Sequence, residues 1–266
     1  MSPVTPGPMK AHLRIHRAGP GTVVTLVGAG AFVLSAAAIG FSPAVLAALP
    51  ARLVEVLGFF YPADMDYGWH SVLPAIVESV QIAWFGTIIA AALSLPLALL
   101  GASTLFPRLA RLVKLISATA RAFPEILLAI YFVPVVGLGP FAGALAIGIS
   151  SVGMLTKLGS EVVESMDHGP VEAVMATGGS RLAALRYAVL PQVIPEFMAH
   201  WLFRFELNIR ASAVLGVVGA GGVGGVLLET LRYRHYEKAA AVLLLTILVV
   251  LLIDMMSGAI RRRILR

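Results

Sequence analysis

Three long stretches of this chain carry no charged side chain. Residues 18–51, 79–107 and 126–156 contain no Asp, Glu, Lys or Arg. A helix that crosses the hydrocarbon core of a bilayer needs about 20 apolar residues. These stretches therefore predict an all-α polytopic membrane protein, and a composition of 59% hydrophobic and 13% charged residues agrees with that class.

The apolar runs divide into about six predicted spans. They form a single membrane domain over residues 21–266, which follows a polar cytoplasmic tail at 1–20. The spans are expected at residues 22–41, 76–101, 115–136, 141–158, 197–218 and 239–258. A connector at 42–75 is expected to hold a short amphipathic helix at 44–58. The basic start of the chain also fits a cleaved signal peptide, but the length of the first run and the spans after it favour a retained helix.

Lysine and arginine indicate the orientation, because cytoplasmic loops of membrane proteins are rich in both. Four basic segments fall on one side of the predicted spans: the tail, residues 108–114, a polar hairpin at 159–194 and the C-terminal arginines. Both termini are therefore expected in the cytoplasm, in a chain that crosses a bacterial cytoplasmic (inner) membrane. One external connector, with Arg232, Arg234 and Lys238, breaks the rule. It fits an anion-attracting or protein-docking cluster as well as a solvated loop.

Several function classes are excluded by what the sequence lacks. It has no cysteine, which excludes disulfides, thiolate nucleophiles and cysteine-based metal sites. It has no GxxxxGK motif followed by Ser or Thr, so the chain itself is not expected to hydrolyse ATP. The net charge of +6 gathers at the ends of apolar runs rather than on a soluble face, so no nucleic-acid partner is expected.

One motif match is interpreted as coincidental. Gly219, Gly221 and Gly224 satisfy the pattern GxGxxG of dinucleotide sites. Such a site needs a preceding strand and a following helix in a βαβ unit, whereas a predicted membrane helix precedes these glycines. Packing or gating is the interpretation retained for them.

The polar hairpin at 159–194 has local signals for two short helices. Pro170 suits the first turn of a helix, and Glu172 lies where the helix dipole favours an anion. Gly178 and its neighbour predict the end of that helix, because glycine accepts the left-handed cap conformation. Ser180 is placed to cap a second short helix, which is expected to end at Leu190-Pro191. A rigid projecting element suits force transfer to a moving partner, and an ordinary amphipathic loop is the alternative.

The spacing of Glu172-Ala173, Gly178 and Leu190-Pro191 resembles the EAA coupling loop of importer-type ABC permeases. Further segments are similar to the permease subunit of phosphonate ABC importers, and the resemblance covers about residues 70–260. The similar segments are Gly169–Ala173, Arg121–Glu125, Asn208–Gly216 and Gly219–Gly222. Two hairpin residues, Val174 and Ala188, depart from the usual loop pattern by small apolar changes.

This resemblance implies a type I ABC importer permease fold and a transport subunit rather than an enzyme. The chain would move phosphonates by alternating access. The residues implied to couple to the ATPase are Pro170, Glu172, Ala173, Gly178, Leu190 and Pro191. The implied partners are a second copy of this chain, a dimer of ATP-binding cassette ATPases and an external substrate-binding protein. ATP and Mg would belong to the ATPase, and no cofactor or metal is implied for this chain.

Other functions stay open on the sequence alone. The same permease class also serves phosphite, methionine or compatible solutes. A membrane-embedded enzyme acting on lipid or phosphoryl substrates, with a carboxylate such as Glu125, belongs to a different class. Such an enzyme would be active without an ATPase.

Charged residues inside the predicted spans are candidates for a substrate pathway, because they are costly in a bilayer and usually functional. Arg121 and Glu125 are four residues apart, as are Glu206 and Arg210, which predicts that the two members of each pair share one helical face. Arg204 or Arg210 facing the pore would suit an anion, because a guanidinium binds phosphonate oxygens in a bidentate way. Alternatively, each pair neutralises itself and holds helices together, or Arg121 and Arg204 snorkel to the boundary.

Overall fold

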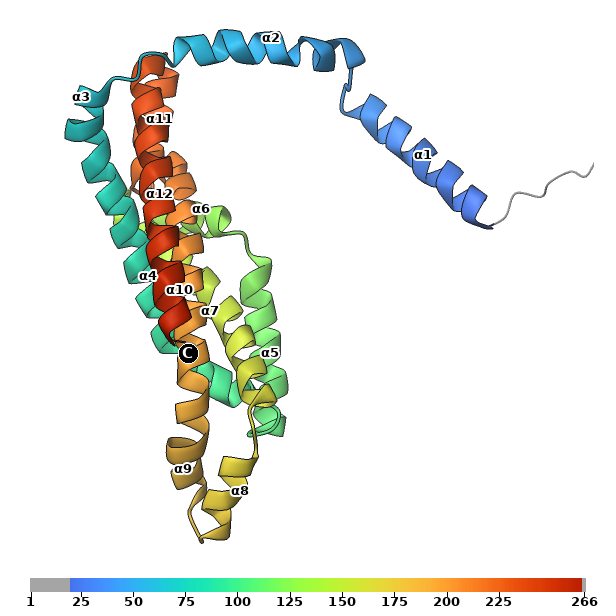
Figure 1. The fold of residues 1–266 in the computed structure, drawn as a ribbon, viewed down its shortest axis with the longest axis vertical. Coiled ribbons are helices and arrows are strands. Elements are labelled where there is room, and N and C mark those ends of the chain that lie inside the picture. Colours follow the sequence, from blue (N-terminus) through green and yellow to red (C-terminus); the bar gives the residue numbers. More distant parts are fainter. Residues whose placement is uncertain (1–19, 265–266) are drawn as a thin grey trace, which may run out of the picture. The chain divides into compact units, whose positions relative to one another are not determined.

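The computed structural model describes residues 20–264, which form helices joined by short connections, with no strand in this range (Figure 1). All but the last residue of the predicted tail at 1–20 lies outside the described residues. The helices of the N-terminal half are α1 (Pro20–Ala38), α2 (Pro43–Phe59), α3 (Met65–Tyr67), η1 (Gly68–Val72), α4 (Leu73–Gly101), α5 (Pro107–Ala122) and α6 (Glu125–Val136). Those of the C-terminal half are α7 (Pro140–Ser165), α8 (Gly169–Ala176), α9 (Arg181–Ala184), η2 (Leu185–Val189), α10 (Leu190–Leu215), η3 (Gly216–Val218), α11 (Val223–Arg232) and α12 (Tyr236–Ile264).

The chain divides into two compact units, residues 1–57 and 58–266. The first contains α1 and most of α2, two apolar helices bent by 59° at the break between them. Helix α2 confirms the helix predicted at 44–58, and α1 confirms the first predicted helix. The second unit contains the polar hairpin and the charged residues singled out in the sequence.

Helices α4 and α7 form the centre of the second unit, and α10 packs against both. Helix α4 buries a small residue at nearly every turn. These residues are Ala75, Ser79, Ala83, Gly86, Ala90, Ser94 and Ala98. Small residues let helices of a membrane bundle approach closely. A Cβ added to Gly86 would lie 2.9 Å from the carbonyl oxygen of Ala144 in α7, so this approach requires glycine.

The glycine-rich connector between α10 and α11 is a packing element. Gly219 and Gly221 have φ of +81° and +79°, which favours glycine at both positions. A Cβ on Gly224 would overlap the carbonyl oxygen of Ala213, so α11 lies directly against α10. The amide of Val223 donates to Ser79 Oγ of α4 at 2.8 Å, which anchors the start of α11. The packing interpretation of these glycines therefore fits their surroundings.

Three helical stretches are long and apolar enough to cross a membrane, and three bent pairs raise the number of candidate spans in the described residues to as many as six. This agrees with the prediction of about six. The straight spans are Met65–Gly101, Pro140–Ser165 and Tyr236–Ile264. The second predicted span begins at Met65 instead of 76, because Asp64 accepts a hydrogen bond from the amide of Tyr67 and caps a helix start there.

The span predicted at 115–136 is not one straight helix but a bent pair. Helices α5 and α6 meet at an angle of 84°. Phe123, at the break, has φ −86° and ψ 120°, an extended conformation. The residue before a proline is disfavoured in helical conformation, so Pro124 accounts for the break. As a result, Arg121 and Glu125 do not share a helical face.

Two π-helical turns each precede a Leu-Pro pair. Turn η1 leads into Leu73-Pro74, and η2 leads into Leu190-Pro191. A proline inside a helix lacks an N–H group and crowds the carbonyl four residues before it. The wide turn shifts hydrogen bonding to five residues, as from the Leu190 amide to Leu185 O, and the helix passes the proline unbroken. The prediction that a separate helix ends at Leu190-Pro191 is therefore wrong, since α9, η2 and α10 run on from Arg181 to Leu215.

Candidate functional site: the hairpin and the charged cleft

Helix α8 begins as its sequence predicts. Asp167 accepts a hydrogen bond from the Gly169 amide at 2.9 Å, and Pro170 lies in the first turn. Glu172 is in the same turn and is exposed. A carboxylate there is favoured by the positive end of the helix dipole. The first arm of the hairpin is therefore defined by its own residues.

A glycine corner closes α8 and starts the second arm. Gly178 has φ +81°, and the amides of Gly178 and Gly179 donate to Met175 O and Val174 O at 3.0 and 3.1 Å. These bonds satisfy carbonyls at the helix end, as in a Schellman-type cap. Ser180 Oγ then accepts from the Ala183 amide at 3.2 Å, which confirms the predicted cap of α9.

The hairpin is fixed to the bundle at its base. Gln192 in α10 donates to Asp167 O at 3.2 Å, just before α8. Glu164, near the end of α7, accepts from the amide and the hydroxyl of Ser103 at 2.7 and 2.6 Å and from Lys114 Nζ at 2.7 Å. One carboxylate oxygen thus joins α7, α5 and the loop after α4. Movement of the hairpin base would be transmitted to all three.

The free surface of the hairpin combines apolar and charged side chains. Met175, Leu182 and Tyr187 are exposed. An apolar groove of about 610 Å³ runs between the hairpin and residues 104–107. Exposed apolar surface of this kind marks contact sites for other proteins. The tip lies at the end of the bundle opposite the α11–α12 turn (Figure 1).

The predicted coupling residues divide into two groups. Pro170, Glu172 and Ala173 lie in α8, and Gly178 forms the corner. Leu190 and Pro191 lie at the start of α10, where Leu190 packs against the buried cluster around Phe197. The first group is at the projecting tip, whereas the second group belongs to the helix that joins the tip to the bundle.

A charged cleft of about 390 Å³ lies between α5, α6, α7 and α10. Its lining residues are Arg121, Phe123, Pro124, Glu125, Ser150, Met154 and Arg204. Arg204 is 8% exposed and forms an ion pair with Glu125. Ser150 Oγ donates to the same carboxylate at 2.9 Å, and Arg204 Nε donates to Ser151 Oγ at 2.8 Å. The guanidinium is therefore held on two sides.

The network behind Arg204 continues to the centre of the bundle. Ser151 Oγ donates to Asn208 Oδ1 at 3.2 Å, and Asn208 Nδ2 donates to Thr87 Oγ1 at 2.9 Å. Asn208 and Ser151 are completely buried. A fully bonded polar network of this kind fixes the rotamers of its members. Arg204 is therefore presented to the cleft in one orientation.

The pairs predicted from four-residue spacing do not form. Arg121 is separated from Glu125 by the break at Pro124, although both line the cleft. Glu206 instead binds Arg261 of α12 at 3.1 Å, and Arg210 forms an ion pair with Asp254 of α12. Both of these pairs join α10 to α12. The structure thus places Arg121 and Glu125 in the cleft, whereas Glu206 and Arg210 lie at the α10–α12 contact.

Sequence reasoning missed the partners of these charges. Asp254 and Arg261 are 44 and 55 residues from Arg210 and Glu206. The one available signal was Asp254 itself, an acidic residue within the last apolar run that needs a cationic partner in a bilayer.

Comparisons with known proteins agree with this architecture. Residues 94–266 match the family model described as binding-protein-dependent transport system inner membrane component. The phosphite transport system permease protein of Stutzerimonas stutzeri is 36% identical over 212 residues, which are 79% of this chain and 77% of that protein. The phosphate-import permease protein of Mycolicibacterium smegmatis is 36% identical over 253 residues, which are 94% of this chain but 47% of that protein.

Solved structures show the same fold. The permease of the MetNI methionine ABC transporter, in an inward-facing conformation, superposes with a TM-score of 0.65 at 21% identity, covering 73% of this chain and 96% of that chain. An amino acid ABC transporter superposes with a TM-score of 0.59 at 16% identity, covering 80% and 97%. The fold is therefore that of type I ABC importer permeases.

The family match settles the class of protein. Members are transport components of the inner membrane, so the prediction of a transport subunit rather than an enzyme is confirmed. The family depends on a substrate-binding protein, and an ABC importer takes its energy from a separate ATPase. The chain belongs to the inner-membrane components of binding-protein-dependent transport systems, the multi-pass permease subunits of ABC importers.

Proposed function

We propose that this chain forms the membrane channel of an importer for phosphonates and that its α8–α9 hairpin couples the channel to the ATPase. The observation that carries the coupling proposal is the hairpin itself, which projects from the bundle with Glu172 and Ala173 exposed. Its base is bonded through Glu164 to α5, α7 and the loop after α4. A push on the tip is therefore passed to the helices that line the charged cleft.

The substrate class rests on the relatives and on the cleft. Relatives at 36–42% identity are named as permeases for phosphite, phosphate and phosphonate. The guanidinium groups of Arg121 and Arg204 both line the cleft, beside the carboxylate of Glu125. Guanidinium groups bind the oxygens of phosphorus oxyanions in a bidentate way. Phosphite is the second candidate, because the phosphite permease covers most of both chains.

Two copies of this chain would enclose one pathway. Arg121, Lys157 and Glu161 are exposed, and the last two lie in the candidate span Pro140–Ser165. Ionisable residues at membrane depth face a water-filled cavity or another protein element rather than lipid. A second copy of the chain would cover these exposed charged side chains and close the pathway on that side. A related permease chain in its place is the alternative, and the subunit stoichiometry of the purified complex distinguishes the two.

The hairpin end of the bundle is proposed to face the cytoplasm, where the ATPase binds ATP and Mg. Lys114 and the hairpin arginines lie toward this end, and cytoplasmic segments are enriched in Lys and Arg. The basic residues near both ends of the sequence favour cytoplasmic termini as well. The turn between α11 and α12 would then face the substrate-binding protein.

Uptake of labelled 2-aminoethylphosphonate into proteoliposomes tests this function. The vesicles would hold this chain with its ATPase and binding protein, and phosphite and phosphate would serve as competitors. Uptake that needs all three proteins and ATP, and that phosphonates alone outcompete, is the expected result. Uptake blocked by phosphite at lower concentration than by phosphonates would assign the phosphite function instead.

A further inference from the structure

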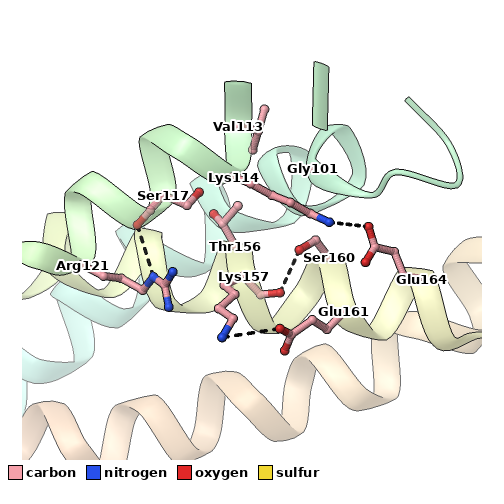
Figure 2. A pocket seen from close by; sticks show the side chains of 10 residues that line it. All are labelled: Gly101, Val113, Lys114, Ser117, Arg121, Thr156, Lys157, Ser160, Glu161 and Glu164. Carbon is pink, nitrogen blue, oxygen red and sulfur yellow. Dashed lines mark hydrogen bonds and ion pairs between the residues drawn. The ribbon is translucent and has the colours of Figure 1, made fainter. Parts of the chain in front are cut away.

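A second cavity, of about 190 Å³, continues from the charged cleft along the groove between α5 and α7 (Figure 2). Its lining residues are Gly101, Val113, Lys114, Ser117, Arg121, Thr156, Lys157, Ser160, Glu161 and Glu164. Arg121 lines both this cavity and the charged cleft, so it forms the wall that they share. Figure 2 shows the charged side chains running from Arg121 at one end of the groove to Glu164 at the other.

The charged residues of the groove lie on one face of each helix. Lys114, Ser117 and Arg121 are spaced by three and four residues on α5, as neighbours on a helical face are. On α7 the same spacing joins Ser150, Met154, Lys157, Glu161 and Glu164. From Ser150 to Glu164 the helix rises by about 20 Å. The face therefore extends from the cleft to the base of the hairpin.

The basic side chains along this face are only partly neutralised. Lys114 pairs with Glu164 at 2.7 Å, and Lys157 pairs with Glu161 at 3.5 Å. Arg121 has no carboxylate partner in the described part of the chain, and its Nε donates to Ser117 O at 3.3 Å. When the ion pair of Arg204 and Glu125 in the adjoining cleft is included, the face carries four basic groups and three carboxylates. The local charge is positive by one unit.

One residue in the wall of the second cavity has a side-chain hydroxyl that forms no hydrogen bond within residues 20–264. Thr156 is 1% exposed, and its Oγ1 has no hydrogen-bond partner among the residues that the structure describes. A buried hydroxyl without a partner is uncommon and costs free energy. Thr156 lines the cavity between Ser117 and Lys157, but its Oγ1 is buried, so an oxyanion would reach this donor only when the groove widens.

We propose that this groove is the release path of the transported phosphorus oxyanion, with Arg204, Arg121, Lys157 and Lys114 as successive contacts from the cleft to the hairpin end. This inference rests on the proposed function and adds the route by which the anion leaves. At each ion pair, the anion takes the place of the carboxylate beside the basic side chain. When the anion moves on, the basic side chain pairs with its carboxylate again. Conduction needs sites that attract an ion and still release it. The paired carboxylates provide that release.

Cysteine accessibility tests the route, and the absence of cysteine from this chain makes the background clean. Glu161→Cys, which leaves Lys157 without its carboxylate, would be treated in the assembled complex from the ATPase side with a sulfonate-bearing methanethiosulfonate reagent and with its trimethylammonium counterpart. The anionic reagent is expected to react several-fold faster, and 2-aminoethylphosphonate with ATP is expected to slow it. Lys157→Cys is the second position, where the preference should be weaker because one positive charge is removed. Leu252→Cys is the control that should stay unreactive, because Leu252 is exposed within the apolar candidate span Tyr236–Ile264, where lipid would cover it. If neither groove variant reacts, or if both prefer the cationic reagent, the route is overturned.

Transport by charge variants tests the lysine directly. Lys157→Gln is expected to reduce uptake per assembled complex about tenfold, the equivalent of one charge-assisted contact, and Lys157→Arg is expected to restore most of it. Arg108→Gln is the matched control, because Arg108 is exposed on α5 and lines neither cavity. Normal uptake by Lys157→Gln overturns the route while leaving the importer function intact.

The two experiments separate failure of the route from failure of the proposed function. If the unmodified complex takes up no phosphonate while the ATPase stays bound, the substrate assignment is wrong. The cysteine reactivity still decides whether the groove is an anion path.

Discussion

The hairpin and the charged cleft are built in opposite ways. In the arms and corner of the hairpin, the bonds that begin and end the helices join residues within a few positions, such as Gly169 with Asp167 and Ala183 with Ser180. In the cleft, the central ion pair joins Glu125 to Arg204, 79 residues away. The hairpin is exposed and presents its side chains to a partner, whereas the cleft network is buried behind Arg204. Substitutions in the cleft should therefore act first on stability, and those in the hairpin on coupling.

The largest loss of stability is expected from Arg204→Ala. It leaves Glu125 without its cation. Removing one partner of a fully buried ion pair costs about 3–5 kcal/mol, and the loss here should lie at or below the lower end of that range because the Glu125 side chain is 26% exposed. Thermal unfolding of the purified complex measures the loss. The double variant Glu125→Gln with Arg204→Met is the control, and it should recover much of the stability because neither charge is left alone. Equal loss in both would place the defect elsewhere than in the pair.

Gly178→Ala comes next, with a strain of about 1–2 kcal/mol, because an L-residue is forced into the left-handed conformation. The effect should be confined to the hairpin, and hydrogen exchange of its amides would show faster opening there than in α4. Gly258→Ala is the matched control, since the nearest atom to its added Cβ, at 3.8 Å, is the end of the flexible Arg262 side chain. Faster exchange throughout the bundle would contradict a locally built hairpin.

Arg210→Ala should have a smaller effect. Arg210 pairs with Asp254 at a position where their side chains are 52% and 30% exposed, so this pair is less enclosed than that of Arg204 and Glu125 and its loss should cost less. Uptake per assembled complex should stay near that of the unchanged chain, because the pair lies at the α10–α12 contact. A large loss of uptake with normal assembly would support the sequence-based hypothesis that Arg210 lines the substrate pathway.

Glu172→Lys should change stability least, by about 0.5 kcal/mol or less, as is usual for an exposed residue. Coupling should nevertheless fail, because the substitution reverses the charge on the face proposed to meet the ATPase. The affinity of the ATPase for the permease and the rate of uptake measure this. Glu237→Lys is the control, in the first turn of α12. If it weakens ATPase binding as much as Glu172→Lys does, the effect is not specific to the hairpin.

The same contrast explains what the sequence could predict. Pro170, Gly178 and Ser180 determine their own surroundings, so the cap, the corner and the first helix were predictable. The break at Phe123 was also signalled, by Pro124, although the apolar run hid it. The π turns before Leu73 and Leu190 were not predictable from the proline alone, because proline more often ends a helix than is accommodated within it.

The partners in the cleft and at the α10–α12 contact depend on tertiary packing. Four-residue spacing suggested Arg121 with Glu125 and Glu206 with Arg210, and each of these residues has a different environment in the structure. The spacing along one helix shows which side chains are close enough to pair. The packing of α6, α10 and α12 against their neighbours determines which ion pairs form. The groove between α5 and α7 was hidden for the same reason.

The most direct test of the account is a cross-link from the hairpin tip. Ala173→Cys would be the single cysteine in the chain and would carry a photo-activated benzophenone group in the assembled complex. Tyr233→Cys, which is exposed at the opposite end of the bundle, would be the control. We predict that the probe at 173 cross-links to the ATPase and that the probe at 233 does not. A cross-link to the ATPase from 233 and none from 173 would contradict both the coupling role of the hairpin and the proposed orientation.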